Sequence, residues 1–275
     1  MLGKTAGGIF WMFRYLERSE NTARLVDAGF RIALTRSATA EKEWESVVAT
    51  AGVRDAYIER HGQFEASAVI DFLLRDRTNS SSVLSVIAEA RDNGRMVRTA
   101  LTREVWEAVN ECWMTLRETL KRPVRERELP LVLDEVRRQS TLVRGALHGT
   151  MLRNEIFYFA RIGTFVERAD NTARILDVKY QILLPASERV GGSLDYFQWT
   201  TILREVSAFN AYHWVYRESI KPMLVADLLI LNRQMPRSFL NCYGQLVEHL
   251  DLIADAYGRR GPSQRLAGNM LAKLE

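Results

Sequence analysis

The sequence contains little of what catalytic and metal-binding motifs are usually built from. It has 2 cysteines and 4 histidines among 275 residues, and neither type shows the close spacing that a zinc site needs. No glycine-rich phosphate loop, nucleophile elbow or HExxH pattern occurs. We therefore expect no catalytic class that a short motif would reveal, and we interpret Cys112 and Cys242 as buried, reduced thiols.

Proline and glycine are also scarce, with 6 and 16 residues respectively, which favours long helices. No long hydrophobic run is present. The apolar stretch Gly7–Phe13 is too short to span a bilayer, and it lacks the small-residue cleavage site of a signal peptide, so we expect it to be helical. The net charge of +4 is spread among acidic residues without a polybasic run, so no nucleic-acid partner is expected. These features predict a cytoplasmic protein that does not bind membranes.

What the chain does contain is helical periodicity along nearly its whole length, with no alternating strand. The run Asn79-Ser80-Ser81-Ser82 and Thr102 offer candidate helix caps, and Pro123 and Pro185 are expected to stop helices. The clearest predicted loop is 186–193. The helices are expected at about 5–35, 40–51, 64–74, 81–101, 102–122, 131–148, 153–184, 194–207, 208–218, 222–232, 237–257 and 262–274.

A repeat is the strongest feature of the sequence. The octapeptide ERSENTAR at Glu17–Arg24 returns as ERADNTAR at Glu167–Arg174. Further matches follow in the same order at nearly constant offset: Trp44 with Trp199, Tyr57 with Tyr212, and the Asp71–Ser82 segment with Asp227–Ser238. Repetition of this kind indicates a duplicated unit of roughly 130 to 150 residues.

The predicted fold is therefore an all-α helical bundle of about ten helices. It is built from two duplicated halves, 1–150 and 151–275, packed together as one domain about a pseudo-two-fold axis. The simplest arrangement places the two motif helices against each other.

Both motif helices carry a polar stripe. Glu17, Glu20, Asn21 and Arg24 lie within about a third of the circumference of one helix, and Glu167, Asp170, Asn171 and Arg174 repeat the pattern on the other. Arg18 and Arg168 point between the polar and apolar faces. Neither arginine can meet the glutamate just before it, so each is expected to reach a carboxylate on another helix.

Four interpretations of this stripe stay open. It could be a solvated helix face. It could be an internal ion-pair network that sets how the halves dock. It could be a site for an amino acid, a peptide end or a phosphate. A carboxylate-bridged metal pair is the fourth, although the Glu-x-x-His spacing of such bundles is not met, and we expect no metal.

Several linked motifs resemble one bacterial family. They include Arg14–Arg24, Asn79–Ser82, Ala90–Arg98, Gly149–Arg153 and Arg161–Asp170, followed by Pro236-Arg237-Ser238. Together they are similar, nearly end to end, to the Alpha-E family, which is named for its predicted helical fold and its Glu-Arg motif.

The resemblance implies a function by association. Members of that family accompany a circularly permuted ATP-grasp protein and a transglutaminase-like protein. This implies a non-catalytic helical partner of an ATP-grasp ligase in peptide or amide-bond formation, with no cofactor of its own and with any ATP bound by the ligase. The alternatives are an enzyme that uses paired carboxylates on an amide, and a purely structural subunit.

The candidate residues for a ligand site or inter-half network are mostly those of the two stripes. They are Glu17, Arg18, Glu20, Asn21, Arg24, Glu167, Arg168, Asp170, Asn171 and Arg174, with Arg91, Asn93, Arg95 and Arg237 behind them.

Overall fold

The computed structural model describes residues 1, 3–35, 40–181 and 193–275. Within these ranges the chain is all-helical and has no strand, as predicted. The helices are α1 (Gly3–Thr35), α2 (Ala40–Thr50), α3 (Arg54–Ile58), α4 (Ala66–Leu74), α5 (Val83–Met96), α6 (Arg103–Thr119), α7 (Leu129–Thr150), α8 (Glu155–Gln181), α9 (Ser193–Glu205), α10 (Phe209–Tyr216), α11 (Pro222–Ile230), α12 (Phe239–Tyr257) and α13 (Pro262–Leu274).

Side-chain caps set several helix starts. The hydroxyls of Ser82, Thr102 and Ser238 each accept a hydrogen bond from the backbone N–H three residues later, at the starts of α5, α6 and α12. Each cap satisfies a donor that the first helical turn leaves without an intrahelical partner. At the other end of α12, Gly258 adopts φ +66°, a left-handed conformation that favours glycine.

Several helix ends lie two or three residues from their predicted positions, and two differences are larger. The expected helix 81–101 ends at Met96 and continues as a short 3₁₀ turn, Arg98–Ala100. The five-residue helix α3 was not predicted, because a single turn carries too little periodicity to detect. The predicted loop 186–193 lies almost entirely outside the described residues, apart from Ser193, which begins α9.

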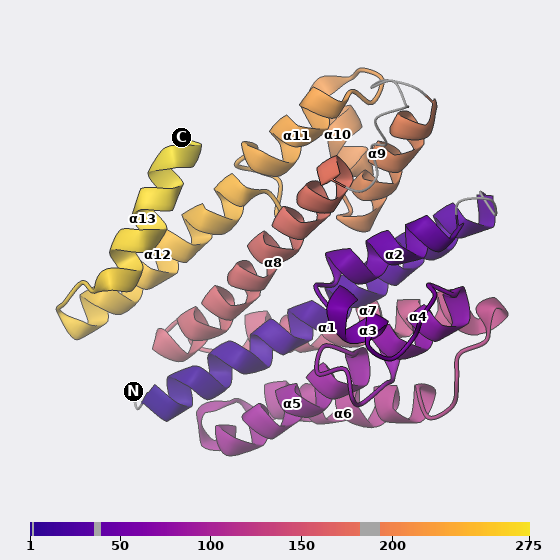
Figure 1. Ribbon diagram of the computed structural model, residues 1–275. Helices are drawn as coiled ribbons and strands as arrows, with labels where there is room; N and C mark the ends of the chain where they lie inside the picture. Colours follow the sequence, from indigo (N-terminus) through magenta and orange to yellow (C-terminus); the bar gives the residue numbers. More distant parts are fainter. Residues whose placement is uncertain (2, 36–39, 182–192) are drawn as a thin grey trace.

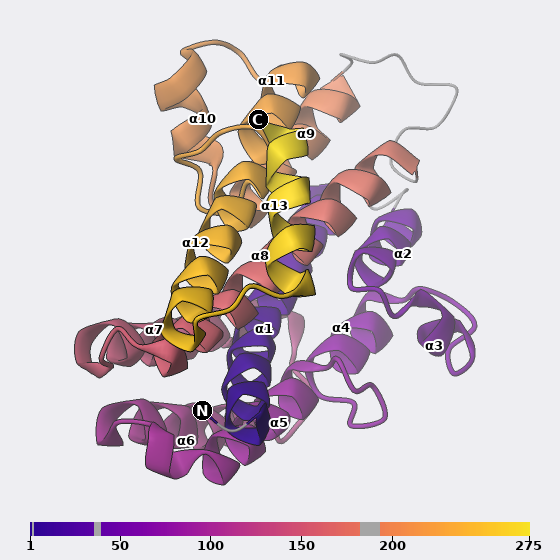
Figure 2. The same ribbon diagram turned by 90° about the vertical axis from the view of Figure 1, so that its left-hand side faces the viewer.

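Helix α1 forms the centre of the molecule, with α8 beside it and α2, α5 and α7 around it. Figures 1 and 2 show α12 and α13 lying on the far side of α8 from α5 and α6. Apolar and polar positions of α1 are buried alike, including Met12, Leu16, Glu17 and Glu20. A helix that is covered on several sides cannot be read as one apolar face and one solvated face.

Glycines bring the central helices into close contact. A Cβ at Gly163 of α8 would clash with the backbone carbonyl of Phe10 on α1. A Cβ at Gly8 of α1 would lie 2.6 Å from the Cγ1 of Val97, next to the end of α5. The absence of a side chain at Gly163 therefore lets α1 and α8 lie close enough for their polar side chains to meet, and the absence of one at Gly8 lets α1 approach the end of α5.

The predicted duplication stays a prediction, although matched positions behave alike. Trp44 and Trp199 are both buried, as are Tyr57 and Tyr212. Each of these tyrosines donates its hydroxyl to a backbone carbonyl six or seven residues later. The proposed boundary between 150 and 151 falls between the end of α7 and the start of α8. Among the described residues, no helix is long and apolar enough to cross a membrane.

Candidate functional site

The two Glu-Arg dipeptides meet where α1 lies against α8, and their contacts are reciprocal. The Nε of Arg18 lies 2.6 Å from the Oε1 of Glu167, and the Nε of Arg168 lies 2.9 Å from the Oε1 of Glu17. Each arginine also donates an Nη2 hydrogen bond to the second oxygen of its partner. The prediction that each arginine reaches a carboxylate on another helix is confirmed, and that helix is in each case the other motif helix.

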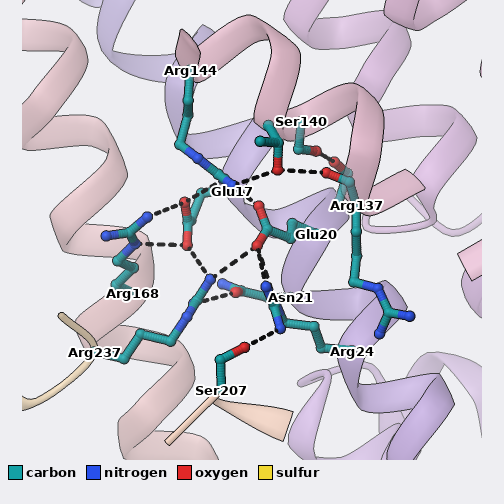
Figure 3. Close-up of polar contacts among 12 residues, drawn as sticks. Glu17, Glu20, Asn21, Arg24, Arg137, Ser140, Arg144, Arg168, Ser207 and Arg237 are labelled. Atoms are coloured by element: carbon teal, nitrogen blue, oxygen red, sulfur yellow. Dashed lines mark hydrogen bonds and ion pairs between the residues drawn. The ribbon is translucent and has the colours of Figure 1, made fainter. Parts of the chain in front are cut away.

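Two more arginines, which the sequence analysis did not select as candidates, join this network. Arg14, one turn before the motif on α1, donates to Glu167 at 2.8 Å. Arg144 of α7 contacts both Glu17 and Glu20 (Figure 3). The position of Arg14 on the motif helix was a usable signal, whereas that of Arg144 depends on how α7 packs against α1.

Arg237 fills the middle of the network. It precedes α12 and its exposed fraction is 5%. Its Nη2 lies 3.0 Å from the Oε1 of Glu17 and 3.3 Å from the Oε1 of Glu20. Its Nη1 donates a hydrogen bond of 2.8 Å to the Oδ1 of Asn21 (Figure 3). The planar guanidinium thereby connects three successive acceptors of α1 to the turn before α12.

The last arginine of each motif lies beside an unusual backbone. Arg24 pairs with Glu20 at 2.8 Å and donates to the hydroxyl of Ser207, a residue with φ +57°. Arg174 lies against Gly52, which has φ +72°, so close that a Cβ there would be 2.5 Å from its Nη1. Positions 52 and 207 are 155 residues apart, the offset of the nearby tryptophan match.

Ion pairing dominates the electrostatics of the network. Burial alone would raise the pKa of Glu17, but the attraction of Arg168, Arg237 and Arg144 outweighs it and brings that pKa to about 2. The pKa of Glu20 is also lowered: burial and the charge of Glu17 raise it, and Arg144, Arg237 and Arg24 outweigh both. Both carboxylates are thus ionised at neutral pH.

Burial excludes the interpretation of the stripe as a solvated face. Glu17, Glu20, Asn21 and Glu167 are each at most 4% exposed. The side chains of Arg18 and Arg24 are partly exposed, at 25% and 19%, and those of the outer pair, Asp170 and Arg174, reach further into solvent, at 41% and 46%. No group of three or more acidic, histidine or cysteine side chains in the described ranges is placed to hold a metal ion.

A polar pocket of about 120 Å³ opens beside the network. Helices α1 and α8 form two of its walls, and the α2–α3 turn and the segment before α5 complete it. Its lining residues are Arg18, Asn21, Thr22, Leu25, Thr50, Ala51, Gly52, Ser81, Glu167, Asp170, Asn171 and Arg174. Six predicted candidates therefore surround one cavity, and the others except the α5 group lie in the adjoining network.

The structure does not bring the three α5 candidates to this site. Arg91 donates to Asn110 at 2.8 Å and lies over the ring of Trp113. Asn93 donates to a backbone carbonyl one turn earlier in α5, and Arg95 pairs with Asp92 at the surface. These contacts are local to α5 and α6, so their use as a ligand site stays an untested prediction.

Glu205 of α9 is a buried carboxyl that the sequence did not mark. Burial raises its pKa to about 8 despite the charges of Arg237 and Arg24, and its Oε1 has no hydrogen-bond partner. It lines a cavity of about 40 Å³ together with Glu43 of α2. No periodicity in α9 distinguished Glu205 from a surface acid, because its burial depends on α1 and α2.

Fold and site together define an all-helical protein whose two central helices are joined by buried, reciprocal Glu-Arg pairs. The model of the Alpha-E family, described as a predicted alpha-helical domain with a conserved ER motif, matches residues 1–275. The chain therefore belongs to the Alpha-E family. No curated protein and no solved structure matches it.

Proposed function

We propose that this chain is a non-catalytic helical partner of an ATP-grasp ligase in a peptide or amide-bond-forming system. A transglutaminase-like protein is the second partner in this proposal. The ligase binds and uses ATP, and the helical chain contributes a rigid surface with a polar pocket. The association of the family with such proteins supports the choice of partner.

One observation carries the non-catalytic role: each acidic side chain of the two motifs is held by arginine. Glu17, Glu20 and Glu167 contact two or three guanidiniums each, and Asp170 contacts Arg174. A general acid or base works best when its pKa lies near the operating pH. A pKa of about 2 for Glu17 is far from that range. The motif carboxylates are therefore better suited to fixing the two helices than to transferring protons.

The rival function, an enzyme that uses carboxylates on an amide, is favoured by Glu205. Its raised pKa of about 8 is typical of an acid-base catalyst. The cavity that it lines has a volume of about 40 Å³, which is close to the share of one water molecule in liquid. An amide substrate would not fit there without opening α2 away from α9, and we therefore favour the partner role.

The test is direct binding and activation. The purified chain is mixed with a circularly permuted ATP-grasp ligase from the same organism, and both co-purification and ATP turnover are measured. A stable complex with increased ATP turnover is the expected result. Absence of both binding and stimulation would reject the proposal, and amide hydrolysis by the chain alone would favour the rival function.

Matched variants separate the partner role from a purely structural subunit. Glu17→Gln and Glu167→Gln each remove one of the reciprocal acceptors. If a variant that stays folded binds the ligase and stimulates ATP turnover like the parent chain, the network has only a structural role. Metal analysis of the purified chain tests the metal-assisted form of the enzyme in the same preparation.

A further inference from the structure

The turns before α5 and α12 follow the same course at an offset of 156 residues. Asp76 and Asn232 each accept a hydrogen bond from the backbone N–H two residues later. Ser82 and Ser238 then cap the helix that follows. The residue just before each cap is Ser81 in the first turn and Arg237 in the second. These two positions therefore correspond, but their side chains differ in length and charge.

This difference decides what lies between each turn and its motif helix. Before α12, the guanidinium of Arg237 occupies the space and binds Glu17, Glu20 and Asn21. Before α5, the short side chain of Ser81 leaves the pocket of about 120 Å³. The corresponding acceptors Glu167, Asp170 and Asn171 all line that pocket. A cationic group of a bound molecule would stand there where Arg237 stands in the other half.

The same pocket also offers donors. The guanidinium of Arg237 can only donate hydrogen bonds, so the Oδ1 of Asn21 faces it. The Nδ2 of Asn21 is buried without a partner, and Asn21 lines the pocket. A buried donor in this state favours a ligand with an acceptor. Arg18 and Arg174 line the pocket as well, so an anionic acceptor would meet two guanidiniums.

Charge and size narrow the ligand further. The pocket is lined by two arginines and two carboxylates, whose charges cancel. A ligand with one positive and one negative group keeps the net charge of the pocket at zero. A volume of 120 Å³ equals the share of roughly four water molecules. That is enough for a compact ligand, and the half-exposed Asp170 and Arg174 stand at the solvent side. An ammonium and a carboxylate on one carbon satisfy all of these conditions.

We propose that this pocket binds a small free α-amino acid as its zwitterion. The ammonium is held by Glu167, Asp170 and the oxygen of Asn171, and the carboxylate by Arg18, Arg174 and the Nδ2 of Asn21. The proposal rests on the proposed function for the use of the amino acid, which would be presented to the amide-forming ligase. The binding itself needs only this chain.

The experiment measures binding to the isolated, full-length chain by calorimetry and by changes in the side-chain amide NMR signals of Asn21. Glycine and L-alanine are the probes, with acetate and methylammonium as single-charge controls and glycinamide and N-acetylglycine as blocked ones. Each control lacks one of the two charge-assisted contacts. Each should therefore bind at least about tenfold more weakly than glycine. Acetate or methylammonium binding as tightly as glycine would overturn the proposal, as would the absence of saturable glycine and L-alanine binding.

A matched pair of variants places the ligand. Ser81→Arg should fill the pocket as Arg237 fills its counterpart, so it should abolish glycine binding while the chain stays folded. Ser80→Arg adds the same charge at an exposed neighbour that does not line this pocket, and it should bind glycine like the parent chain. Undiminished glycine binding by a folded Ser81→Arg chain would overturn the assignment.

The two proposals can fail separately. If the chain binds glycine but neither binds nor stimulates the ligase, only the proposed partner function is contradicted. A chain that binds the ligase but shows no saturable amino-acid binding contradicts only the pocket assignment.

Discussion

The guanidinium of Arg168 on α8 holds the carboxylate of Glu17 on α1 through two hydrogen bonds of 2.9 and 3.3 Å. Glu17 is 2% exposed, and this contact joins residues 151 positions apart in the chain. A buried charge pair has little effect on which helices form, but it penalises every packing that leaves either charge alone. We therefore expect the pair to set how α1 and α8 dock.

Glu17→Gln is expected to lower the free energy of unfolding by about 3–5 kcal/mol, because three guanidiniums lose a buried anion. Urea denaturation followed by circular dichroism measures this change. The control is Glu45→Gln, which breaks a surface pair with Arg54 at 2.7 Å and should cost about 1 kcal/mol or less. Equal losses in the two variants would contradict a structural role for the network.

Arg237→Lys is expected to destabilise the chain by about 2 kcal/mol or more, since one ammonium cannot reproduce the hydrogen bonds to both Asn21 and Glu20. The control Arg233→Lys alters an exposed pair with Glu275 and should change stability by about 0.5 kcal/mol or less. The midpoints of urea unfolding decide the comparison, and a tolerated Arg237→Lys would show that charge alone is sufficient.

Gly163→Ala should destabilise the chain by about 1–3 kcal/mol, because its Cβ meets the Phe10 carbonyl and separates α1 from α8. Gly145→Ala on α7 is the matched helical control, since no atom lies within 4 Å of its added Cβ. It should instead stabilise the chain by about 0.5–1 kcal/mol. Thermal unfolding of both variants provides the measurement, and a shift of the same sign in both would reject the close-approach explanation.

The free energy of unfolding should depend on pH through the titration of two separate carboxyl groups. The pKa of Glu17 is lowered on folding, so its contribution is present above about pH 4.5 and is lost as the pH falls toward 2. The pKa of Glu205 is raised to about 8, so the folded chain loses stability as the pH rises from about 4.5 to 8, while only the unfolded form ionises.

Glu205→Gln isolates the second effect. The variant should gain stability over the parent by up to about 1.4 kcal/mol for each pH unit between about 5 and 8. Urea midpoints measured at pH 5, 6, 7 and 8 test this slope. A difference that is constant with pH would mean that Glu205 is already ionised in the folded chain.

Helix positions and the pairing of the motif helices were predictable from local signals. The Ser82 and Thr102 hydroxyls cap the helices that follow, and both residues lie at sequence-predicted helix starts. The angular position of Arg18 and Arg168 between the helix faces was enough to exclude a pair with the glutamate just before each of them. The roles of Arg144 and Glu205 were not predictable, because each depends on the packing of another helix against α1.

The sequence by itself determined the all-helical architecture, the repeated Glu-Arg stripe and the expectation that Arg18 and Arg168 reach carboxylates on another helix. These follow from periodicity and side-chain direction within single helices. Only the tertiary structure decided that the stripe is buried, that Arg237 occupies one of two corresponding positions, and that Ser81 leaves a pocket at the other. Those outcomes depend on which side chains from distant segments fill the same space, and no local pattern contains that information.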